Sequence, residues 1–161
     1  MFKFKRSNNK SNLELLCSRL YNEKSFYPAF IADAKRATAS IIIESPFISY
    51  RRLNWLYPTL EKAVRRGVSI TVNTRDPQYH DEFMQKQAAD GIKALQNIGI
   101  EVLYTGNLHR KLAIIDSLVL WEGSLNILSQ TDSCEVMRRI ESTDLAKQMI
   151  RFTGLERWYT K

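Results

Sequence analysis

The segment from His109 to Asn126 holds side chains that together could cleave a phosphodiester. It contains His-Arg-Lys, four further residues, Asp116, six further residues and then Gly-Ser-Leu-Asn, and it occurs once in the 161 residues. In an extended segment, residues two apart share a face, so His109 and Lys111 project the same way. A neutral imidazole there can attack phosphorus, while the ammonium binds a non-bridging oxygen and offsets charge in the transition state.

The remaining motif residues are expected to reach the same place through a hairpin. Two short apolar strands, residues 111–115 and 118–122, are separated only by Asp-Ser, which predicts a tight turn. The return strand would bring the Gly-Ser-Leu-Asn segment back beside the start of the first strand. Ser124 and Asn126 would then act as neutral donors to the phosphate oxygens, and Gly123 would let the backbone approach the ligand.

Asp116 stands apart from this group, although it belongs to the pattern of candidate catalytic residues. It follows Lys111 by five residues, which along a strand is on the order of 16 Å, so within one subunit it should not reach the same phosphate. We expect its side chain to accept backbone amides in the hairpin, as Asp often does in turns.

The complete pattern resembles the signature of the phospholipase D superfamily of phosphodiesterases. The resemblance extends to Ile41–Ser49, where a strand and Ser-Pro-Phe-Ile-Ser are similar to the first strand and loop of compact family members. It implies two steps: one histidine forms a covalent phosphohistidine, a second protonates the leaving oxygen, and water releases the intermediate. It also implies an acidic residue that contacts His109 and fixes its tautomer. Glu135 is the best candidate, with Glu122 and Asp132 as alternatives.

The family builds one active site from two such motifs, whereas this chain carries one. Its only other histidine, His80, has no lysine two residues on and no Gly-Ser-x-Asn segment behind it, so we expect a surface residue near a helix start. The resemblance therefore implies a homodimer in which His109 of a second subunit completes the site. No metal-ligand set accompanies the motif, so no metal or other cofactor is expected.

Composition sets the broad class of protein. With 44% hydrophobic and 25% charged residues, the chain fits one compact domain, and its net charge of +7 favours a polyanionic partner such as nucleic acid. Cys17 and Cys134 are too few and too far apart for a disulfide framework or a zinc site. Aliphatic stretches such as Ile41–Ile43 are far too short to span a bilayer. We therefore expect a soluble, cytoplasmic protein without stable membrane association.

Helix and strand patterns alternate along the chain. Residues 1–12 are expected to be a basic flexible arm, and residues 13–161 a single phospholipase D-like domain. The apolar spacing predicts helices around Leu13–Leu20 and at 29–39, 53–66, 81–98 and about 142–152, and strands at 40–44, 68–72, 100–104, 111–115, 118–122 and 135–140. Successive β-α-β units indicate an α/β fold: a single-domain α/β/α sandwich with a mixed, mostly parallel sheet and a β-hairpin that carries the motif.

Fold and mechanism do not decide which phosphodiester is cleaved. Compact single-motif members resemble endonucleases, and basic clusters could track a phosphate backbone, so a nuclease acting on DNA, or on RNA, is the leading interpretation. Phe47 and Tyr50 could stack on bases and Arg51 and Arg52 could bind phosphates, while Trp55 is expected in the core. A lipid phosphodiesterase and a non-catalytic DNA-binding module of a larger helicase or restriction protein remain alternatives.

Overall fold

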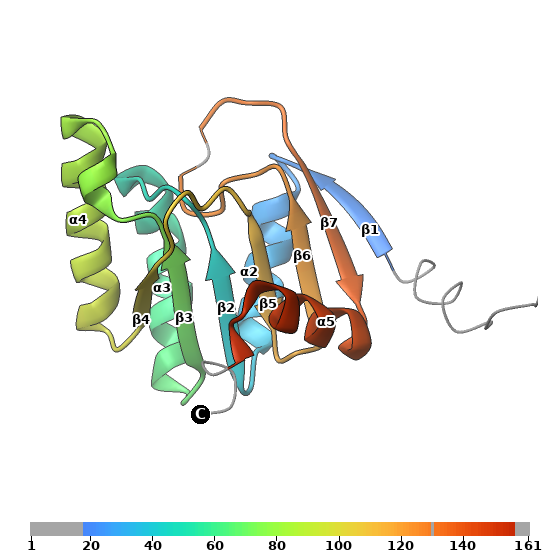
Figure 1. Ribbon diagram of the computed structural model, residues 1–161. Coiled ribbons are helices and arrows are strands. Elements are labelled where there is room, and N and C mark those ends of the chain that lie inside the picture. The colour runs from blue at the N-terminus through green and yellow to red at the C-terminus, as the bar shows by residue number, and fades with distance from the viewer. Residues whose placement is uncertain (1–17, 130, 157–161) are drawn as a thin grey trace, which may run out of the picture.

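The computed structural model describes residues 18–129 and 131–156. At its centre is a seven-stranded sheet in the order β1-β7-β6-β5-β2-β3-β4 (Figure 1). The strands are β1 (Ser18–Asn22), β2 (Ser40–Glu44), β3 (Ser69–Thr74), β4 (Glu101–Tyr104), β5 (Leu112–Ile115), β6 (Val119–Gly123) and β7 (Val136–Glu141). The helices are α2 (Phe26–Arg36), α3 (Tyr50–Arg65), α4 (Glu82–Asn97) and α5 (Thr143–Thr153), with a 3-10 turn η1 (Pro77–Tyr79).

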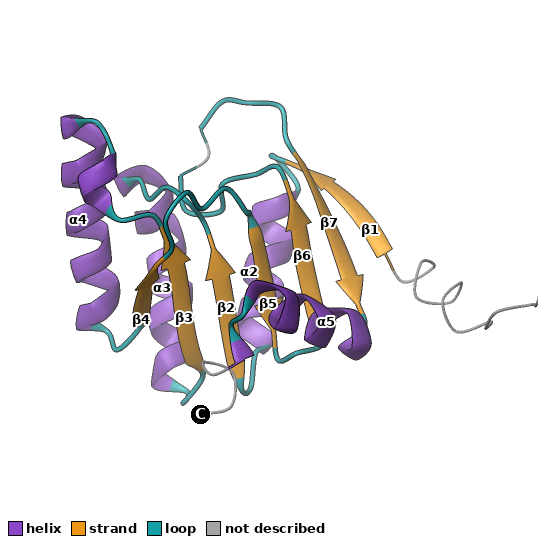
Figure 2. Cartoon of the chain, viewed as in Figure 1, coloured by secondary structure: helices purple, strands orange, loops and turns teal. Residues whose placement is uncertain are grey.

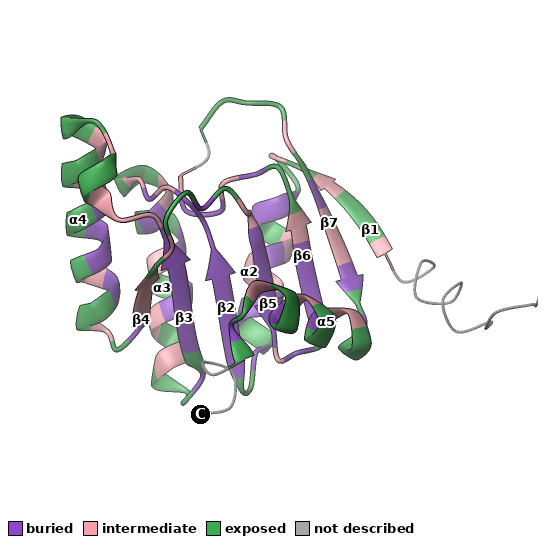
Figure 3. Cartoon of the chain, in the orientation of Figure 1, coloured by how far each residue is buried: buried purple, intermediate pink, exposed green. Residues whose placement is uncertain are grey.

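Helices cover both faces of the sheet, with α5 in front of it and α2 and α3 behind it in the view of Figure 2. Alternate residues of β2 divide between two cores: Ile41 and Ile43 face the larger core under α2, α3 and α4, whereas Ile42 faces the smaller core under α5. The central strands are buried along most of their length (Figure 3). The predicted α/β/α sandwich is confirmed.

The balance of strand directions differs from the prediction. Two of the six pairings between described strands, β2–β3 and β3–β4, are parallel, and the other four are antiparallel. The sheet is mixed, but the expectation of a mostly parallel sheet is wrong. After β4 the chain enters the sheet beside β2 without a crossover helix, and β5, β6 and β7 then follow as consecutive antiparallel neighbours.

The predicted helix around Leu13–Leu20 is wrong where the structure describes it. Residues 18–22 form the edge strand β1, which pairs antiparallel with β7. Pairing with β7 satisfies the backbone there, whereas the helical spacing depended on a few leucines, of which Leu20 is 64% exposed. The rest of that predicted helix, and the basic arm of residues 1–12, lie outside the described residues.

The helix α2 begins at Phe26, three residues before its predicted start. Pro28 lies in its first turn, where a missing N–H removes no helical hydrogen bond. The earlier start buries Phe26 and Tyr27, and the Phe26 ring packs edge-on against Trp121 of β6 with centroids 5.1 Å apart. The Tyr27 hydroxyl donates to the carbonyl of Ile127 at 3.0 Å, which ties α2 to the loop after β6.

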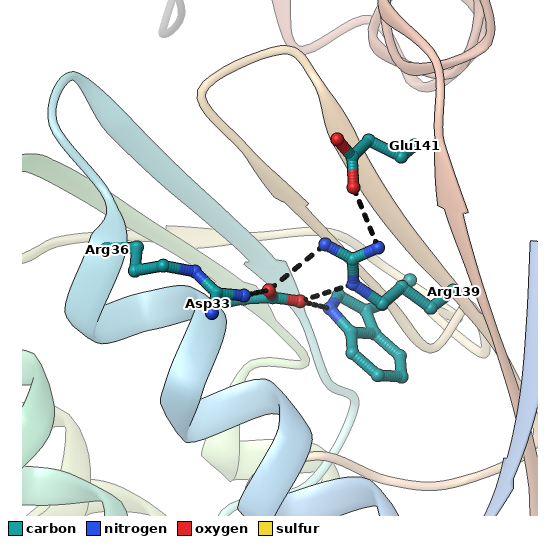
Figure 4. Close-up of polar contacts among 5 residues, drawn as sticks. Asp33, Arg36, Arg139 and Glu141 are labelled. Carbon is teal, nitrogen blue, oxygen red and sulfur yellow. Dashed lines mark hydrogen bonds and ion pairs between the residues drawn. The ribbon is translucent and has the colours of Figure 1, made fainter. Parts of the chain in front are cut away.

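A buried ion-pair network fixes the other end of α2 to the sheet (Figure 4). Asp33, only 4% exposed, accepts from Nε1 of Trp121 at 3.0 Å and from two guanidinium nitrogens of Arg139 at 2.8 and 3.1 Å. Arg36 adds a bond of 2.5 Å to the same carboxylate, and Glu141 binds the far side of Arg139 at 3.0 Å. The hydrogen bond with Asp33, and to a lesser extent that with Glu141, raises the pKa of Arg139. The network holds α2 against β6 and β7.

Candidate active site

The motif residues gather at one end of the sheet, where β2 and β3 finish, β5 begins and β6 ends (Figure 1). We refer to this end as the site end. All the predicted site residues except Asp116 belong to segments that begin or finish there: His109, Lys111, Gly123, Ser124, Asn126, Glu135, Phe47, Tyr50, Arg51 and Arg52.

The β5–β6 hairpin brings the two halves of the motif together. Leu112 pairs with Glu122, and one step further the Gly123 amide donates to the Lys111 carbonyl at 3.2 Å. The ladder therefore continues beyond the last residues of the two strands. In this register Gly123 lies opposite Lys111, and Ser124 follows it directly. The Gly-Ser-Leu-Asn segment therefore lies beside the His-Arg-Lys segment.

His109 and Lys111 form the basic part of the site. His109 is exposed and Lys111 is half-buried. The Lys111 ammonium donates to the backbone carbonyl of His109 at 2.6 Å, so the cation is held beside the histidine. An anionic ligand that reaches this imidazole would meet a positive charge at the same place.

Ser124 and Glu135 are bonded to each other across the loop between β6 and β7. The Ser124 hydroxyl donates to one carboxylate oxygen of Glu135, and the Ser133 hydroxyl donates to the other at 2.6 Å. The Ser124 amide donates to the Val136 carbonyl at 2.9 Å, and the Val136 amide donates back to the Ser124 hydroxyl at 3.1 Å. Glu135 is thus fixed at the site end by two serines, while its contact with the histidine stays a prediction.

Asn126 retains hydrogen-bonding capacity at the site end. The residue is half-buried, and its side-chain oxygen is buried without a hydrogen-bond partner within residues 18–129 and 131–156. Buried polar atoms are normally satisfied in folded proteins. This oxygen can accept a hydrogen bond from a ligand, whereas a phosphate oxygen would have to be bound by the amide nitrogen of the same side chain.

A polar network that the sequence interpretation missed lies beside the His-Arg-Lys segment. Glu44, the last residue of β2, is fully buried and binds Nε and a terminal nitrogen of Arg110 at 2.5 and 2.7 Å. The Asn73 side chain also donates to Glu44, at 2.7 Å, and accepts from the Thr105 hydroxyl at 3.0 Å. The sequence feature that could have indicated this network is Glu44 itself, a charged residue at the end of an otherwise apolar buried strand.

Asp116 lies at the opposite end of the sheet, in the β5–β6 turn. It adopts a left-handed φ of 52°, and Ser117 a φ of 48°. Its carboxylate accepts from the amides of residues 38–40 at 2.8–2.9 Å and from the Thr38 hydroxyl at 3.1 Å. The amides therefore come from the two residues before β2 and from its first residue, and not from the hairpin, contrary to the prediction. The structure does not bring Asp116 to the His109 of its own chain.

Gly123 is required by strand packing. A Cβ atom at this position would lie 2.1 Å from the carbonyl oxygen of Val136 and 2.8 Å from the sulfur of Met137. Both neighbours belong to β7, which pairs with β6 at this point. The close approach that the structure shows at Gly123 is between two strands, and an approach to a ligand stays a prediction.

Phe47 and His80 meet in the loops at the site end. Their rings are 5.0 Å apart, and the guanidinium of Arg75 lies 5.7 Å from the Phe47 ring. His80 is half-buried, with Nε2 buried and unpaired within the described part of the chain, so the expectation of a plain surface residue is wrong. Burial, and then the charge of Arg75, lower the pKa of His80.

The first turns of α3 carry the other residues expected to bind substrate. Tyr50 is 39% exposed, and its hydroxyl donates to Asp90 at 2.5 Å, a bond that raises the pKa of Tyr50. The Arg52 guanidinium lies over the Tyr27 ring at 4.0 Å and over the Trp55 ring at 5.1 Å. Trp55 is 47% exposed, so its expected place in the core is wrong: its ring packs against Tyr27 of α2 with centroids 4.9 Å apart.

Within residues 18–129 and 131–156, no three His, Cys, Asp or Glu side chains are grouped so that they could hold a metal ion. None of the helices in these residues is both long and apolar enough to cross a membrane. Cys134 is exposed, and Cys17 lies outside the described residues.

Comparison with known proteins identifies the family. A family model described as "Cardiolipin synthase, PLD-like domain" matches residues 30–155. No curated protein sequence matches this chain significantly.

Several solved structures have a similar fold. Nuc from Salmonella typhimurium, described as a phospholipase D family member, is 19% identical with a TM-score of 0.67 over 88% of this chain and 90% of its own. NucT from Helicobacter pylori is 18% identical with a TM-score of 0.69 over 84% and 91%. TrmBL2, an archaeal chromatin protein, is 15% identical with a TM-score of 0.59 over 87% and 52%. These likenesses show the fold, and the family model, which spans more than half of the sequence, shows that the chain belongs to the phospholipase D-like family.

Proposed function

We propose that this chain is a metal-independent phosphodiesterase that cleaves nucleic acid, with DNA as the leading substrate, at a site shared by two subunits. The observation that carries the proposal is the hairpin that sets the Gly-Ser-Leu-Asn segment beside His109 and Lys111. Membership of the phospholipase D-like family supports phosphodiester chemistry. The net charge of +7 supports a polyanionic substrate.

In the proposed reaction the imidazole of His109 attacks phosphorus, and the bond from phosphorus to the leaving oxygen breaks. His109 of the partner subunit donates the proton that the leaving oxygen needs. Water then attacks the phosphohistidine, gives its proton to that second imidazole, and breaks the phosphorus–nitrogen bond. Lys111 and Asn126 bind the non-bridging oxygens, and Ser124 joins them once its hydroxyl turns from Glu135. Glu135 then stabilises the imidazolium that forms.

Lys111 and the neutral donors supply the charge and hydrogen bonds for which other phosphodiesterases use a metal ion. The proposal therefore expects activity to survive chelation. It also expects the substrate to be bound through its phosphates, since exposed Arg51 and half-buried Arg52 lie on the helix that starts at the site end. Such contacts carry no sequence preference of their own.

One assay tests the proposal. Plasmid DNA, single-stranded DNA, RNA and phospholipid vesicles are each incubated with the protein in excess EDTA, alongside His109→Ala. Cleavage of nucleic acid by the wild type, with none by the variant, is the expected result. Cleavage restricted to the lipid would favour a lipid phosphodiesterase, and DNA retention without cleavage would favour a binding module. Activity that EDTA abolishes and magnesium restores would contradict the metal-independent mechanism.

The other histidine provides a matched control. His80→Gln should keep most of the activity, because the second catalytic imidazole is expected from the partner subunit. If His80→Gln were as inactive as His109→Ala while both remained folded, a site within one subunit would replace the shared one.

A further inference from the structure

We infer that the buried Glu44–Arg110 pair is a positioning device that aims His109 and Lys111 at the substrate phosphate, an inference that rests on the proposed function. Arg110 stands between the two catalytic candidates in the sequence, and its guanidinium is bonded to Glu44 at the end of β2. Neither residue belongs to the recognised motif. The pair would act through the backbone of the His-Arg-Lys segment and not by touching the substrate.

The alternation of side chains explains how anchoring Arg110 directs its neighbours. Leu112 and Ile114 of β5 face the smaller core under α5, whereas Ala113 and Ile115 face the larger one. The ladder continues back to Lys111 through its bond from the Gly123 amide, so Arg110 falls on the face of Leu112. With Arg110 held on that face, its two neighbours are turned to the opposite one.

The anchor is rigid because Glu44 sits among the central strands. It pairs with Leu112 of β5 on one side and with Asn73 of β3 on the other. The side chain is 0% exposed and accepts three hydrogen bonds, two from Arg110 and one from Asn73. If Arg110 swung away, a carboxylate would remain buried without its counter-charge, which is strongly unfavourable.

The geometry also argues against a direct role for Arg110 in binding phosphate. Its Nε and one terminal nitrogen are both bonded to Glu44, in the paired arrangement that guanidinium and carboxylate groups favour. The hydrogen bond with Glu44 raises the pKa of Arg110, so the guanidinium stays protonated. A guanidinium engaged in this way orients the segment that contains it.

The test uses Glu44→Gln, which keeps the size of the side chain and removes its charge. With a short DNA oligonucleotide as substrate, we expect kcat to fall about 100-fold with little change in KM, the loss that a displaced catalytic group can cause. Arg110→Gln should give the same loss, and the double variant should lose no more than either single one. The ring resonances of His109 in NMR spectra should shift in Glu44→Gln.

Asp33→Asn is the matched control, because among the described residues Asp33 is also a buried carboxylate held by two nitrogens of one arginine. It should lower Tm while leaving kcat and the His109 resonances unchanged at a temperature where it is folded. An unchanged kcat in folded Glu44→Gln would overturn the inference. A rise in KM confined to Arg110→Gln would also overturn it, in favour of direct phosphate binding.

The inference and the proposed function can fail separately. A wild-type protein that cleaves none of the substrates would refute the proposed function. The NMR comparison would then still decide whether Glu44 positions His109, since it needs no turnover. Resonances of His109 that stay in place in Glu44→Gln would overturn the inference even in an active enzyme.

Discussion

Gly123 shows at the residue scale how a motif position can be determined by packing. An alanine there would place its Cβ 2.1 Å from the Val136 carbonyl oxygen, so β6 and β7 would have to separate. We expect Gly123→Ala to lower the free energy of unfolding by about 2–3 kcal/mol in urea denaturation. Gly106→Ala is the control, because a Cβ at Gly106 meets nothing within 4 Å. Unchanged stability in Gly123→Ala, together with weakened phosphate binding, would instead support the predicted role of Gly123 in ligand binding.

His80 allows a second test at the residue scale, since the chain has only two histidines and NMR can follow each ring. Burial, then Arg75, lower its pKa from the ordinary value of 6.5, so the ring should titrate below that pH. The folded protein favours the neutral imidazole of His80. The free energy of unfolding therefore keeps this contribution above pH 6.5 and loses it as pH falls below 6.5, where the ring must be protonated.

The cause of the His80 shift can be checked by removing the ring that covers it. In Phe47→Ala the pKa of His80 should move back towards its ordinary value, because the imidazole becomes more hydrated. A pKa above 6.5 in the wild type would contradict the described packing.

Among the elements, α2 depends on the Asp33 network for its attachment to β6 and β7. Asp33→Ala would leave Arg139, whose side chain is 17% exposed, without its main partner. Breaking a buried ion pair in this way should cost about 3–5 kcal/mol in the free energy of unfolding, measured in urea. Arg36→Gln is the comparison: its side chain is 71% exposed, and its removal should cost less than about 1 kcal/mol. Equal losses in the two variants would refute this account.

Hydrogen bonds to Asp116 connect the β5–β6 turn with the start of β2, and the stability that they contribute should depend on pH. Burial alone would raise the pKa of Asp116, but hydrogen bonds from Ser40, Thr38 and Ala39 outweigh it and bring the pKa below 3.8. The stabilisation is therefore present above pH 3.8 and is lost as pH falls below it. Asp116→Asn should be less stable than the wild type at pH 7 and should lose less stability on acidification. Parallel stability–pH curves for the two proteins would contradict this.

On the scale of the whole molecule, the proposed reaction needs the single motifs of two chains in one site. Wild-type and His109→Ala chains mixed in equal amounts should keep half of the wild-type activity before subunits exchange. After co-refolding, random pairing should reduce it to about one quarter, because mixed dimers lack one imidazole. Activity that stays at one half, or a fully active monomer in equilibrium sedimentation, would contradict the shared site.

Much of the architecture was predictable because it depends on local pattern. Strand β2 has the predicted ends, since Ser40–Glu44 is a buried β-branched run. The hairpin was predictable because two apolar runs flank Asp-Ser, although the loop between β5 and β6 has three residues, 116–118, where two were expected. The antiparallel half of the sheet was not, because strand partners are chosen by contacts between segments far apart in the chain. Edge strand β1, which pairs with β7, is the clearest case.

The sequence by itself determined the family and the motif that carries the proposed chemistry, because the residue types and spacing from His109 to Asn126 are local. Tertiary structure alone decided what supports them. Glu44 reaches Arg110 across 66 positions, and Asp116 reaches Thr38 across 78. Such contacts produce no repeating pattern in the sequence. The two partners meet only after folding has brought their strands together, and only then does the ion pair compensate the burial of the charge.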